Sequence, residues 1–383
     1  RGASRDEQTI LARYVGWGGL RGVFDPRETG ATTANGKAQA RLRELLTPED
    51  YRAAAGSTED AFFTGRTVVA AMWAKMRDFG FTGGRALEPS AGIGAFLGHQ
   101  PADLAERTEW YASELDKVSS LIAGLLYPDA VLRAGEGFEA ARFRLGSMDI
   151  AIGNPPYSAR TMQSDLHTDI PPFSVHNFMV AKSAMLLREG GIMGFVVTHR
   201  FMDRMTAEAR SFFARHLNFL GAVRLPDTLF ADAGTRVTTD IVFFQKRAEG
   251  KPEGDLSWLM TDVPFGSLKV NGYFAKHPDM MLGRPAMDGH RYSADADAVF
   301  ALHDDGRDLV AALAGALAKI TGMLPPRAGE MVTALLPDRT ESDLAIGESI
   351  LLDDGRIMMR GDDDAAGNSI VTEVTPKTIL GAR

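Results

Sequence analysis

The 383-residue sequence contains no cysteine, which excludes disulfide bonds, thiolate-zinc sites and thiol nucleophiles. It also contains no uninterrupted apolar run near the roughly 20 residues that a membrane-spanning helix needs. The N-terminus lacks the charged-then-apolar order of a secretory signal. These absences predict a soluble, cytoplasmic protein. Apolar residues make up 45% of the chain, which is enough to bury at least one large core.

Positive charge is scarce. The chain has 42 lysine and arginine residues against 50 acidic ones, and its formal net charge is -8. This balance argues against a strong non-specific grip on nucleic acid. A DNA-facing surface would have to be a local basic patch, or the affinity would have to come from another domain or subunit.

Hydrophobic patterning divides the chain into three regions. Residues 1–60 read as an N-terminal extension of helix and loop, and residues 61–250 alternate helix with strand. Residues 251–383 form a less regular C-terminal extension that could recognise DNA or act as a linker. This extension contains a predicted helix over residues 311–320 and a predicted hairpin over residues 350–359 on an Asp-Gly turn.

The middle region predicts a sheet. Its five short apolar strands, with helical segments between them, indicate parallel strands covered on both faces: Arg85–Ser90, Glu109–Leu115, Ala130–Glu136, Met148–Gly153 and Gly191–Thr198. Residues 220–225 and 239–245 follow with only a loop between them, which forces antiparallel pairing. We therefore expect an α/β fold with a Rossmann-like sheet and a final antiparallel hairpin. This arrangement is typical of S-adenosylmethionine (SAM)-dependent methyltransferases, unlike most dinucleotide dehydrogenases.

A glycine turn follows the first strand. Residues 88–94 read Glu-Pro-Ser-Ala-Gly-Ile-Gly, and glycines 92 and 94 allow a tight turn and close approach of backbone to a ligand. The alternative is a strand-turn-helix junction without a ligand. Glu114 ends the second strand, about twenty residues on, where a carboxylate accepts from ribose hydroxyls; alternatively it is a solvated strand end. Because both features lie on one strand-helix-strand unit, we favour ligand binding.

Two features favour SAM over a dinucleotide. A dinucleotide fingerprint has a third spaced glycine, but Phe96 and Leu97 occupy that stretch. Glu88, at the tip of the first strand, could meet the cationic end of SAM, a role that NAD does not require.

The tetrapeptide Asn154-Pro155-Pro156-Tyr157 follows the fourth strand, at the sheet edge where open α/β folds bind ligands. The Asn154 side-chain carbonyl and the Pro155 main-chain carbonyl can both accept from one amine, and proline stiffens the loop. Tyr157 offers a π-face to a base rotated out of its helix. The alternative is a Pro-Pro turn capped by asparagine. Such a site needs positioning and preorganised acceptors, and no strong general base.

The missing cysteine bears on this chemistry. Methylation of the cytosine ring carbon normally proceeds through a covalent cysteine adduct. We therefore expect the methyl acceptor to be an amine.

At these residues the chain resembles the γ-arranged adenine-specific DNA methyltransferases, over roughly residues 60–250. Phe62-Phe63-Thr64 resembles the aromatic-Thr-Pro segment that closes over SAM, with Gly65 in place of proline. The third cofactor motif, usually an aspartate near a phenylalanine, reads Gly-Glu-Gly-Phe-Glu over residues 135–139, so the group that holds the SAM adenine is left open. The resemblance implies methyl transfer from SAM to adenine in DNA, with base flipping. The expected cofactor residues are Phe63, Thr64, Glu88, Pro89, Ser90, Ala91, Gly92, Gly94, Phe96, Glu114, Glu136 and Phe138.

Two further segments, residues 12–20 and 271–278, resemble large methyltransferase–helicase fusions carried by phages, plasmids and integrative elements. Since the chain has no Walker loop or helicase motif, this resemblance implies the methyltransferase portion of a longer polypeptide, with a fused or associated helicase as partner. We expect no metal and no membrane partner.

Several basic residues follow strands four to six near the expected cofactor edge. They could face DNA or be solvated surface residues: Arg160, His199, Arg200, Arg204, Arg224 and Arg236. The loop over residues 158–175 is the expected clamp over a flipped base, although it could be disordered without DNA.

Other substrates stay open. The same tetrapeptide occurs in enzymes that methylate glutamine amides of release factors and in some that act on RNA bases. A SAM-binding but catalytically idle module that helps a helicase recognise DNA is a further alternative. The sequence does not reveal a recognition sequence.

Overall fold

The computed structural model describes residues 2–14, 16–18, 20, 22–27, 32–56, 58, 64–158, 160–229, 237–248, 250–251, 253–261, 263–265, 268–288, 299–327, 349–351, 357–360 and 371–373. The chain forms two compact units, Arg1–Ala141 with Leu145–Pro325, and Arg142–Arg144 with Pro326–Arg383.

The described part of the second unit is a small antiparallel sheet. It consists of β14 (Ser349–Leu351), β15 (Ile357–Arg360) and β16 (Val371–Glu373). The pairing of β14 with β15 confirms the hairpin predicted over residues 350–359, whose Asp-Gly turn lies outside the described residues.

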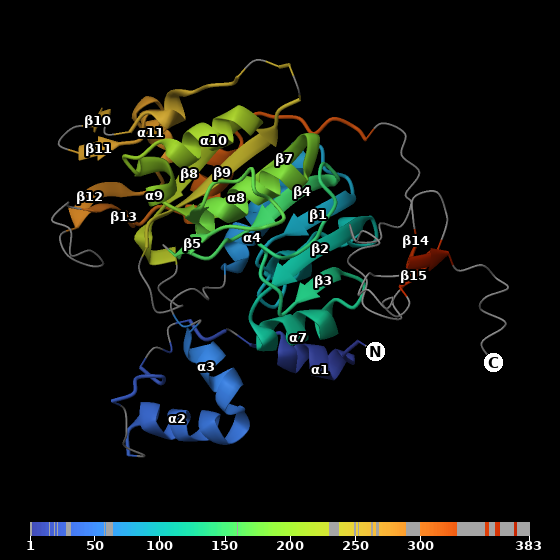
Figure 1. The fold of residues 1–383 in the computed structure, drawn as a ribbon. Coiled ribbons are helices and arrows are strands. Elements are labelled where there is room, and N and C mark those ends of the chain that lie inside the picture. Colours follow the sequence, from blue (N-terminus) through green and yellow to red (C-terminus); the bar gives the residue numbers. More distant parts are fainter. Residues whose placement is uncertain are drawn as a thin grey trace. The chain divides into compact units, whose positions relative to one another are not determined.

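The first unit is built on a seven-stranded sheet with the order β3-β2-β1-β4-β7-β9-β8 (Figure 1). Five strands are parallel: β3 (Val131–Ala134), β2 (Thr108–Glu114), β1 (Gly84–Glu88), β4 (Met148–Gly153) and β7 (Leu187–Thr198). The strand β9 (Thr239–Lys246) runs antiparallel to both β7 and β8 (Leu217–Leu225). This topology confirms the predicted fold class, a mostly parallel sheet ending in an antiparallel hairpin.

The burial of the central strands shows that other elements cover both faces of the sheet. All six residues of β4 are buried, and because alternate side chains point to opposite faces, both faces of this strand are covered. Figure 1 shows α8 (Val175–Leu186) and α10 (Glu208–His216) lying together over the sheet. On α4 (Arg66–Asp78), the buried side chains include Val68, Val69, Met72, Trp73 and Met76.

The remaining helices of the sheet region are short or peripheral. They are α5 (Ala95–Gly98), α6 (Ala102–Ala105), α7 (Lys117–Leu126), α9 (Arg200–Asp203) and α12 (Leu309–Leu317), and the last of these matches the helix predicted over residues 311–320. Among the described residues no helix has the length and apolar character needed to cross a membrane.

The N-terminal segment carries α1 (Arg5–Leu11), α2 (Ala34–Leu45) and α3 (Pro48–Gly56). Ser4 starts α1 with a capping box, in which its hydroxyl accepts from the Glu7 backbone and the Glu7 carboxylate accepts from the Ser4 backbone. The segment also has its own small core, made of Trp17, Val23, Phe24, Tyr51 and Ala54.

Residues after β9 belong to the same unit as the sheet. They form η2 (Ser257–Leu259), β10 (Val263–Phe265), β11 (Leu268–Val270), α11 (Gly272–Lys276), η3 (Pro278–Met280), β12 (Arg284–Asp288) and β13 (Val299–His303). The first unit continues to Pro325.

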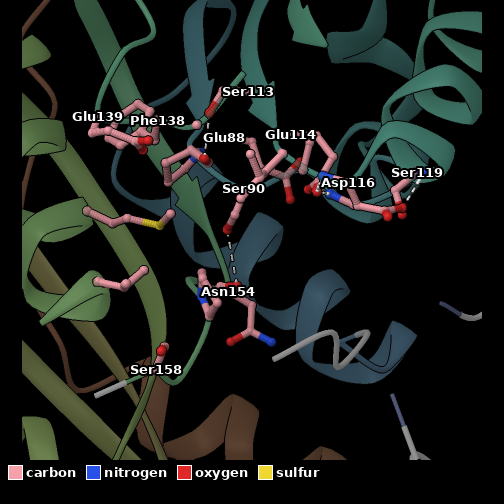
Figure 2. Close-up of a pocket in the computed structure, with 18 of the residues that line it drawn as sticks. Glu88, Ser90, Ser113, Glu114, Asp116, Ser119, Phe138, Glu139, Asn154 and Ser158 are labelled. Atoms are coloured by element: carbon pink, nitrogen blue, oxygen red, sulfur yellow. Dashed lines mark hydrogen bonds between the residues drawn. The ribbon is translucent and has the colours of Figure 1, made fainter. Parts of the chain in front are cut away.

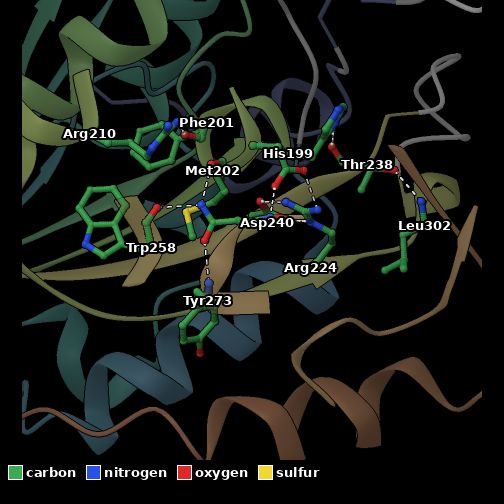
Figure 3. A network of polar contacts seen from close by, with 12 residues as sticks. His199, Phe201, Met202, Arg210, Arg224, Thr238, Asp240, Trp258, Tyr273 and Leu302 are labelled. Atoms are coloured by element: carbon green, nitrogen blue, oxygen red, sulfur yellow. Dashed lines mark hydrogen bonds and ion pairs between the residues drawn. The ribbon is translucent and has the colours of Figure 1, made fainter. Parts of the chain in front are cut away.

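A buried ionic network joins this segment to the sheet (Figure 3). On β8 the Arg224 guanidinium donates to both oxygens of Asp240 at 2.7 and 2.9 Å, and to Asp203 at 2.7 Å. The backbone N–H of Asn271 donates to the Asp203 carboxylate at 3.1 Å, and the Asn271 side-chain amide donates to the Trp258 main-chain carbonyl at 2.7 Å. The network therefore links the segment that carries Trp258 and Asn271 to two strands of the sheet.

Candidate active site

A cavity of about 530 Å³ lies where the carboxyl ends of β1, β2, β3 and β4 meet. Parallel strands bring these ends to one sheet edge, so loops far apart in sequence converge there. Figure 2 shows Glu88 at the end of β1 and Ser90 after it, Glu114 at the end of β2 and Asp116 after it, and Asn154 after β4, all around this space. The predicted glycine turn and the predicted tetrapeptide thus face one cavity.

The turn after β1 is held by its neighbours. Gly92 and Gly94 have φ angles of 57° and 83°, a left-handed conformation that glycine adopts readily. A Cβ on Gly94 would collide with the ring of Tyr127. The Ser113 hydroxyl donates to the Pro89 carbonyl at 2.7 Å. Gly92 lines the cavity and Gly94 does not, so the second glycine serves the shape of the turn.

Glu114 braces this turn. One carboxylate oxygen accepts from the Gly92 N–H at 2.7 Å, and the other accepts from the Asp116 N–H at 2.7 Å. Burial raises the pKa of Glu114 to about 7 although both hydrogen bonds lower it. A carboxylate has about four lone-pair sites, so it can still accept from a ligand hydroxyl.

Glu88 has an oxygen that is left without a partner. Its side chain is 2% exposed, and within the described part of the chain its Oε2 atom has no hydrogen-bond partner. Burial, together with the nearby Glu114 carboxylate, raises the pKa of Glu88 well above its usual value. A buried acceptor of this kind in a cavity wall fits a cationic or hydrogen-bond-donating ligand.

In the loop after β3, the acidic residue that lines the cavity lies further along the chain than the expected one. Gly137, Phe138 and Glu139 line it, whereas the expected residue Glu136 does not. Since β3 ends at Ala134, the first loop residues complete the turn and the following ones reach the cavity. Glu139 Oε2 is buried and without a partner among the described residues.

A buried lysine on α8 holds this loop in place through hydrogen bonds to its main chain. Lys182 on α8 is fully buried, and its ammonium donates to the Phe138 carbonyl at 2.5 Å and to the Ala141 carbonyl at 2.6 Å. It also lies 4.8 Å from the centroid of the Phe138 ring. No local pattern in the sequence indicates this role of Lys182, because the role depends on how α8 packs against the loop.

The tetrapeptide after β4 contributes Asn154 and Pro156 to the cavity lining. Pro155 is buried, Tyr157 is half-buried, and neither is among the lining residues. The Tyr157 hydroxyl donates to Asn154 Oδ1 at 2.7 Å. The Ser90 hydroxyl donates to the main-chain carbonyl of Asn154 at 3.4 Å (Figure 2). A direct contact therefore joins the glycine turn to the tetrapeptide.

The expected basic residues divide into two groups. Arg160, which lines the cavity, and Arg200 and Arg204 are exposed. Arg224 and His199 are buried, which is at odds with the expectation that they face DNA. Arg224 forms ion pairs with Asp240 and Asp203. Burial lowers the pKa of His199 to about 4, so its imidazole is neutral at pH 7.

Other expected residues have mixed placements. Pro89, Ser90, Ala91, Phe96 and Thr64 line the cavity, while Phe63 and Arg236 lie outside the described residues. The cavity is also lined by residues outside the expected set, which include Ser113, Asp116, Ser119 and Trp17. The first three lie close to Glu114 in sequence, and this proximity is the sequence feature that could have indicated that they line the cavity.

The loop over residues 158–175 lies against the same cavity. Ser158, Arg160, Met162 and Val175 line it, and a short antiparallel pair, β5 (Thr161–Met162) with β6 (Phe173–Ser174), orders the loop.

Comparisons with known proteins match this region. Residues 107–227, which include Glu114 and the tetrapeptide but not the glycine turn, match the family described as Eco57I restriction-modification methylase. The chain is 26% identical over 208 residues to the Defense against restriction protein B of Escherichia phage P1. That alignment spans 53% of this chain but 9% of the phage protein.

Solved structures with a related fold include two subunits of type I restriction systems. One is a modification subunit of a putative enzyme from Vibrio vulnificus YJ016, with 19% identity, a TM-score of 0.43, and coverage of 57% of this chain and 54% of that one. The other is a methyltransferase subunit from Streptococcus thermophilus, with 17% identity, a TM-score of 0.43, and coverage of 59% and 57%.

Proposed function

We propose that this chain transfers a methyl group from SAM to the exocyclic amine of adenine in DNA. The observation that carries the proposal is the meeting of the glycine turn and the tetrapeptide at one cavity, joined by the Ser90–Asn154 hydrogen bond. The match to a restriction-modification methylase family, and the likeness to a phage protein named for defence against restriction, support DNA as the substrate.

The donors and acceptors around the cavity fit SAM. Glu88 offers a buried oxygen without a partner to the cationic amino-acid end, and Glu114 offers acceptors to ribose hydroxyls. Glu139 offers a second buried oxygen to the adenine amine, and Phe138 offers an aromatic surface. When bound, SAM supplies an electrophilic methyl group on a sulfonium sulfur.

The tetrapeptide would hold the acceptor amine. Asn154 Oδ1 and the Pro155 carbonyl accept from the two amine hydrogens and draw the nitrogen lone pair out of conjugation with the ring. The amine nitrogen forms the new bond to the methyl carbon as the sulfur–carbon bond breaks, and the extra proton then leaves to water. The acceptors contribute by position and preorganisation, so no strong base is needed.

The Tyr157 phenol must share or release Asn154 for this step. An amide oxygen has two lone pairs, so it can accept from the phenol and from a substrate amine together. If the phenol instead leaves, its ring becomes available to stack on a flipped base.

That same hydrogen bond favours a second candidate function, a SAM-binding module that does not catalyse. In that case Tyr157 would keep Asn154 occupied, and the protein would serve a longer polypeptide, fused to or associated with a helicase, in recognising DNA. The small share of the phage relative that is matched is compatible with this role.

Transfer of tritiated methyl groups separates these candidates. The protein would be incubated with labelled SAM and with DNA, RNA or a glutamine-containing release-factor peptide, alongside calorimetry of SAM binding. We expect label in DNA with the wild type and with Asn35→Ala, an exposed asparagine substitution that serves as the control, and none with Asn154→Ala. SAM binding without label in any acceptor would favour the idle module, and label confined to RNA or peptide would reject DNA as the substrate.

A further inference from the structure

Trp17 is one of the residues that line the cavity, and its indole carries a hydrogen-bond donor. The residue is 8% exposed, and its indole Nε1 is buried with no hydrogen-bond partner among the described residues. Two other tryptophans satisfy theirs: Trp73 Nε1 donates to the Phe96 carbonyl and Trp110 Nε1 donates to Gln100, both at 2.9 Å. A buried indole N–H usually finds an acceptor, so an indole N–H without one on a cavity-lining residue points to a ligand acceptor.

Neighbouring aromatic rings hold the Trp17 side chain in place. Tyr14 packs edge-on against it with ring centroids 5.7 Å apart, and Phe24 does so at 5.8 Å. Phe24 in turn packs on Tyr51 of α3 at 5.1 Å. Because these contacts come from both sides of Trp17 in sequence, the indole is presented by a packed cluster rather than by a loose loop.

The N-terminal segment is attached beside the cofactor turn. The Ala3 N–H donates to the Leu125 carbonyl of α7 at 3.0 Å, and Glu49 pairs with Lys117 at 2.7 Å. Val118, in the first turn of α7, packs against the Trp17 cluster. Since α7 starts directly after Glu114 and Asp116, these contacts set Trp17 next to the residues proposed to face the ribose.

We infer that Trp17 is a cofactor-binding residue, whose indole N–H donates to an acceptor on the adenosyl group of SAM, and that residues 2–56 form part of the cofactor site. This inference rests on the proposed function. The adenosyl group is the matching chemistry because its ribose oxygens and ring nitrogens accept hydrogen bonds, and the indole N–H donates regardless of pH, whereas the ionised carboxylates of Glu88, Glu114 and Glu139 accept.

The test compares Trp17→Phe with Trp258→Phe in the full chain. The first substitution keeps an aromatic ring and deletes the N–H, and the second changes a buried tryptophan that is not among the cavity-lining residues. The probe is S-adenosylhomocysteine, titrated by calorimetry. We expect Trp17→Phe to weaken binding about tenfold, as the loss of one hydrogen bond would, and Trp258→Phe to bind within about twofold of wild type.

Thermal unfolding separates binding from folding. Because the indole N–H has no partner among the residues that the structure describes, Trp17→Phe should melt at or near the wild-type temperature without ligand and show a smaller ligand-induced rise. Wild-type affinity and a wild-type rise in Trp17→Phe would overturn the inference while leaving the proposed function intact. Absence of binding to the wild type itself would reject both.

A second measurement does not depend on that variant folding. Protein labelled with 5-fluorotryptophan has four fluorine signals, one for each tryptophan. Variants of the other three tryptophans assign the Trp17 signal by elimination. The Trp17 signal should shift most when S-adenosylhomocysteine binds. Binding that moves the other signals and leaves this one in place would contradict the inference.

Discussion

The phenol of Tyr157 donates to the amide oxygen of Asn154 at 2.7 Å, so the two side chains proposed to handle the base hold each other in the structure. The centroid of the Tyr157 ring lies 5.9 Å from that of the His176 imidazole, and Tyr157 is not among the residues that line the cavity. We therefore expect this hydrogen bond to break and the ring to turn when Tyr157 stacks on a flipped base.

This relationship predicts that the ring of Tyr157 matters more than its hydroxyl. Tyr157→Phe removes the competing donor and keeps the π-face, so methylation should persist at or above the wild-type rate. Tyr157→Ala removes the stacking surface, worth about 1–3 kcal/mol per base, and should raise KM for DNA roughly 5-fold to 150-fold. Steady-state kinetics measures both. Equal losses in the two variants would show that the hydroxyl itself is required.

Glu88 predicts a pH-dependent stability. Its pKa in the folded protein is raised above 4.5, so the folded state holds this proton more tightly than the unfolded chain. The resulting stability is present below about pH 4.5 and is lost as pH rises through the raised pKa. Glu88→Gln should therefore lose less stability than wild type between pH 4.5 and pH 8 in thermal unfolding, and should bind SAM at least about tenfold more weakly.

The control for Glu88 is Glu106→Gln, which changes an exposed carboxylate outside the cavity lining. It should follow the wild-type curve in both measurements. If Glu88→Gln also follows that curve, the unpaired buried oxygen is not the source of the effect.

Lys182 predicts a coupled loss of stability and cofactor affinity. Lys182→Met would remove the ammonium that donates to the buried carbonyls of Phe138 and Ala141, a loss of about 1–3 kcal/mol for each hydrogen bond. Urea unfolding measures the stability, and calorimetry measures SAM binding. Lys319→Met, which breaks an exposed pair with Asp279, should change stability by no more than about 1 kcal/mol. Wild-type SAM affinity in folded Lys182→Met would separate the loop from the cofactor.

Two arginines predict opposite phenotypes. Arg160 is exposed at the cavity, so Arg160→Ala should keep wild-type stability, weaken DNA binding and lower the salt-dependence slope by about one. Arg224→Ala leaves the buried Asp240 and the partly buried Asp203 without the guanidinium and should destabilise the protein by about 3–5 kcal/mol. Fluorescence anisotropy across a salt series and urea unfolding measure these effects. An unchanged slope in Arg160→Ala would remove this residue from the DNA contacts.

The strands of the sheet were predictable because their signals are local. Apolar runs such as Met148–Gly153 end at turn-forming residues, and the short link between β8 and β9 leaves only antiparallel pairing. The same locality places Asn154 and Gly92 at one sheet edge, since parallel strands share their carboxyl ends.

Side-chain partners far apart in sequence could not be predicted in this way. Arg224 looked like a surface cation because its two carboxylate partners lie on β9 and α9. Glu139 rather than Glu136 reaches the cavity because the turn after β3 decides where the loop arrives. Trp17 belongs to an N-terminal segment whose contact with α7 only the folded chain reveals.

Nucleoside mass spectrometry of DNA treated with SAM and protein tests the central claim most directly. If one cavity joins methyl donor and adenine amine, unmethylated mixed-sequence DNA should yield N6-methyl-2′-deoxyadenosine with wild type and with Asn35→Ala, and none with Asn154→Ala. Methylation on another base, or methyladenine that persists in Asn154→Ala, would contradict the assignment of the amine to this tetrapeptide.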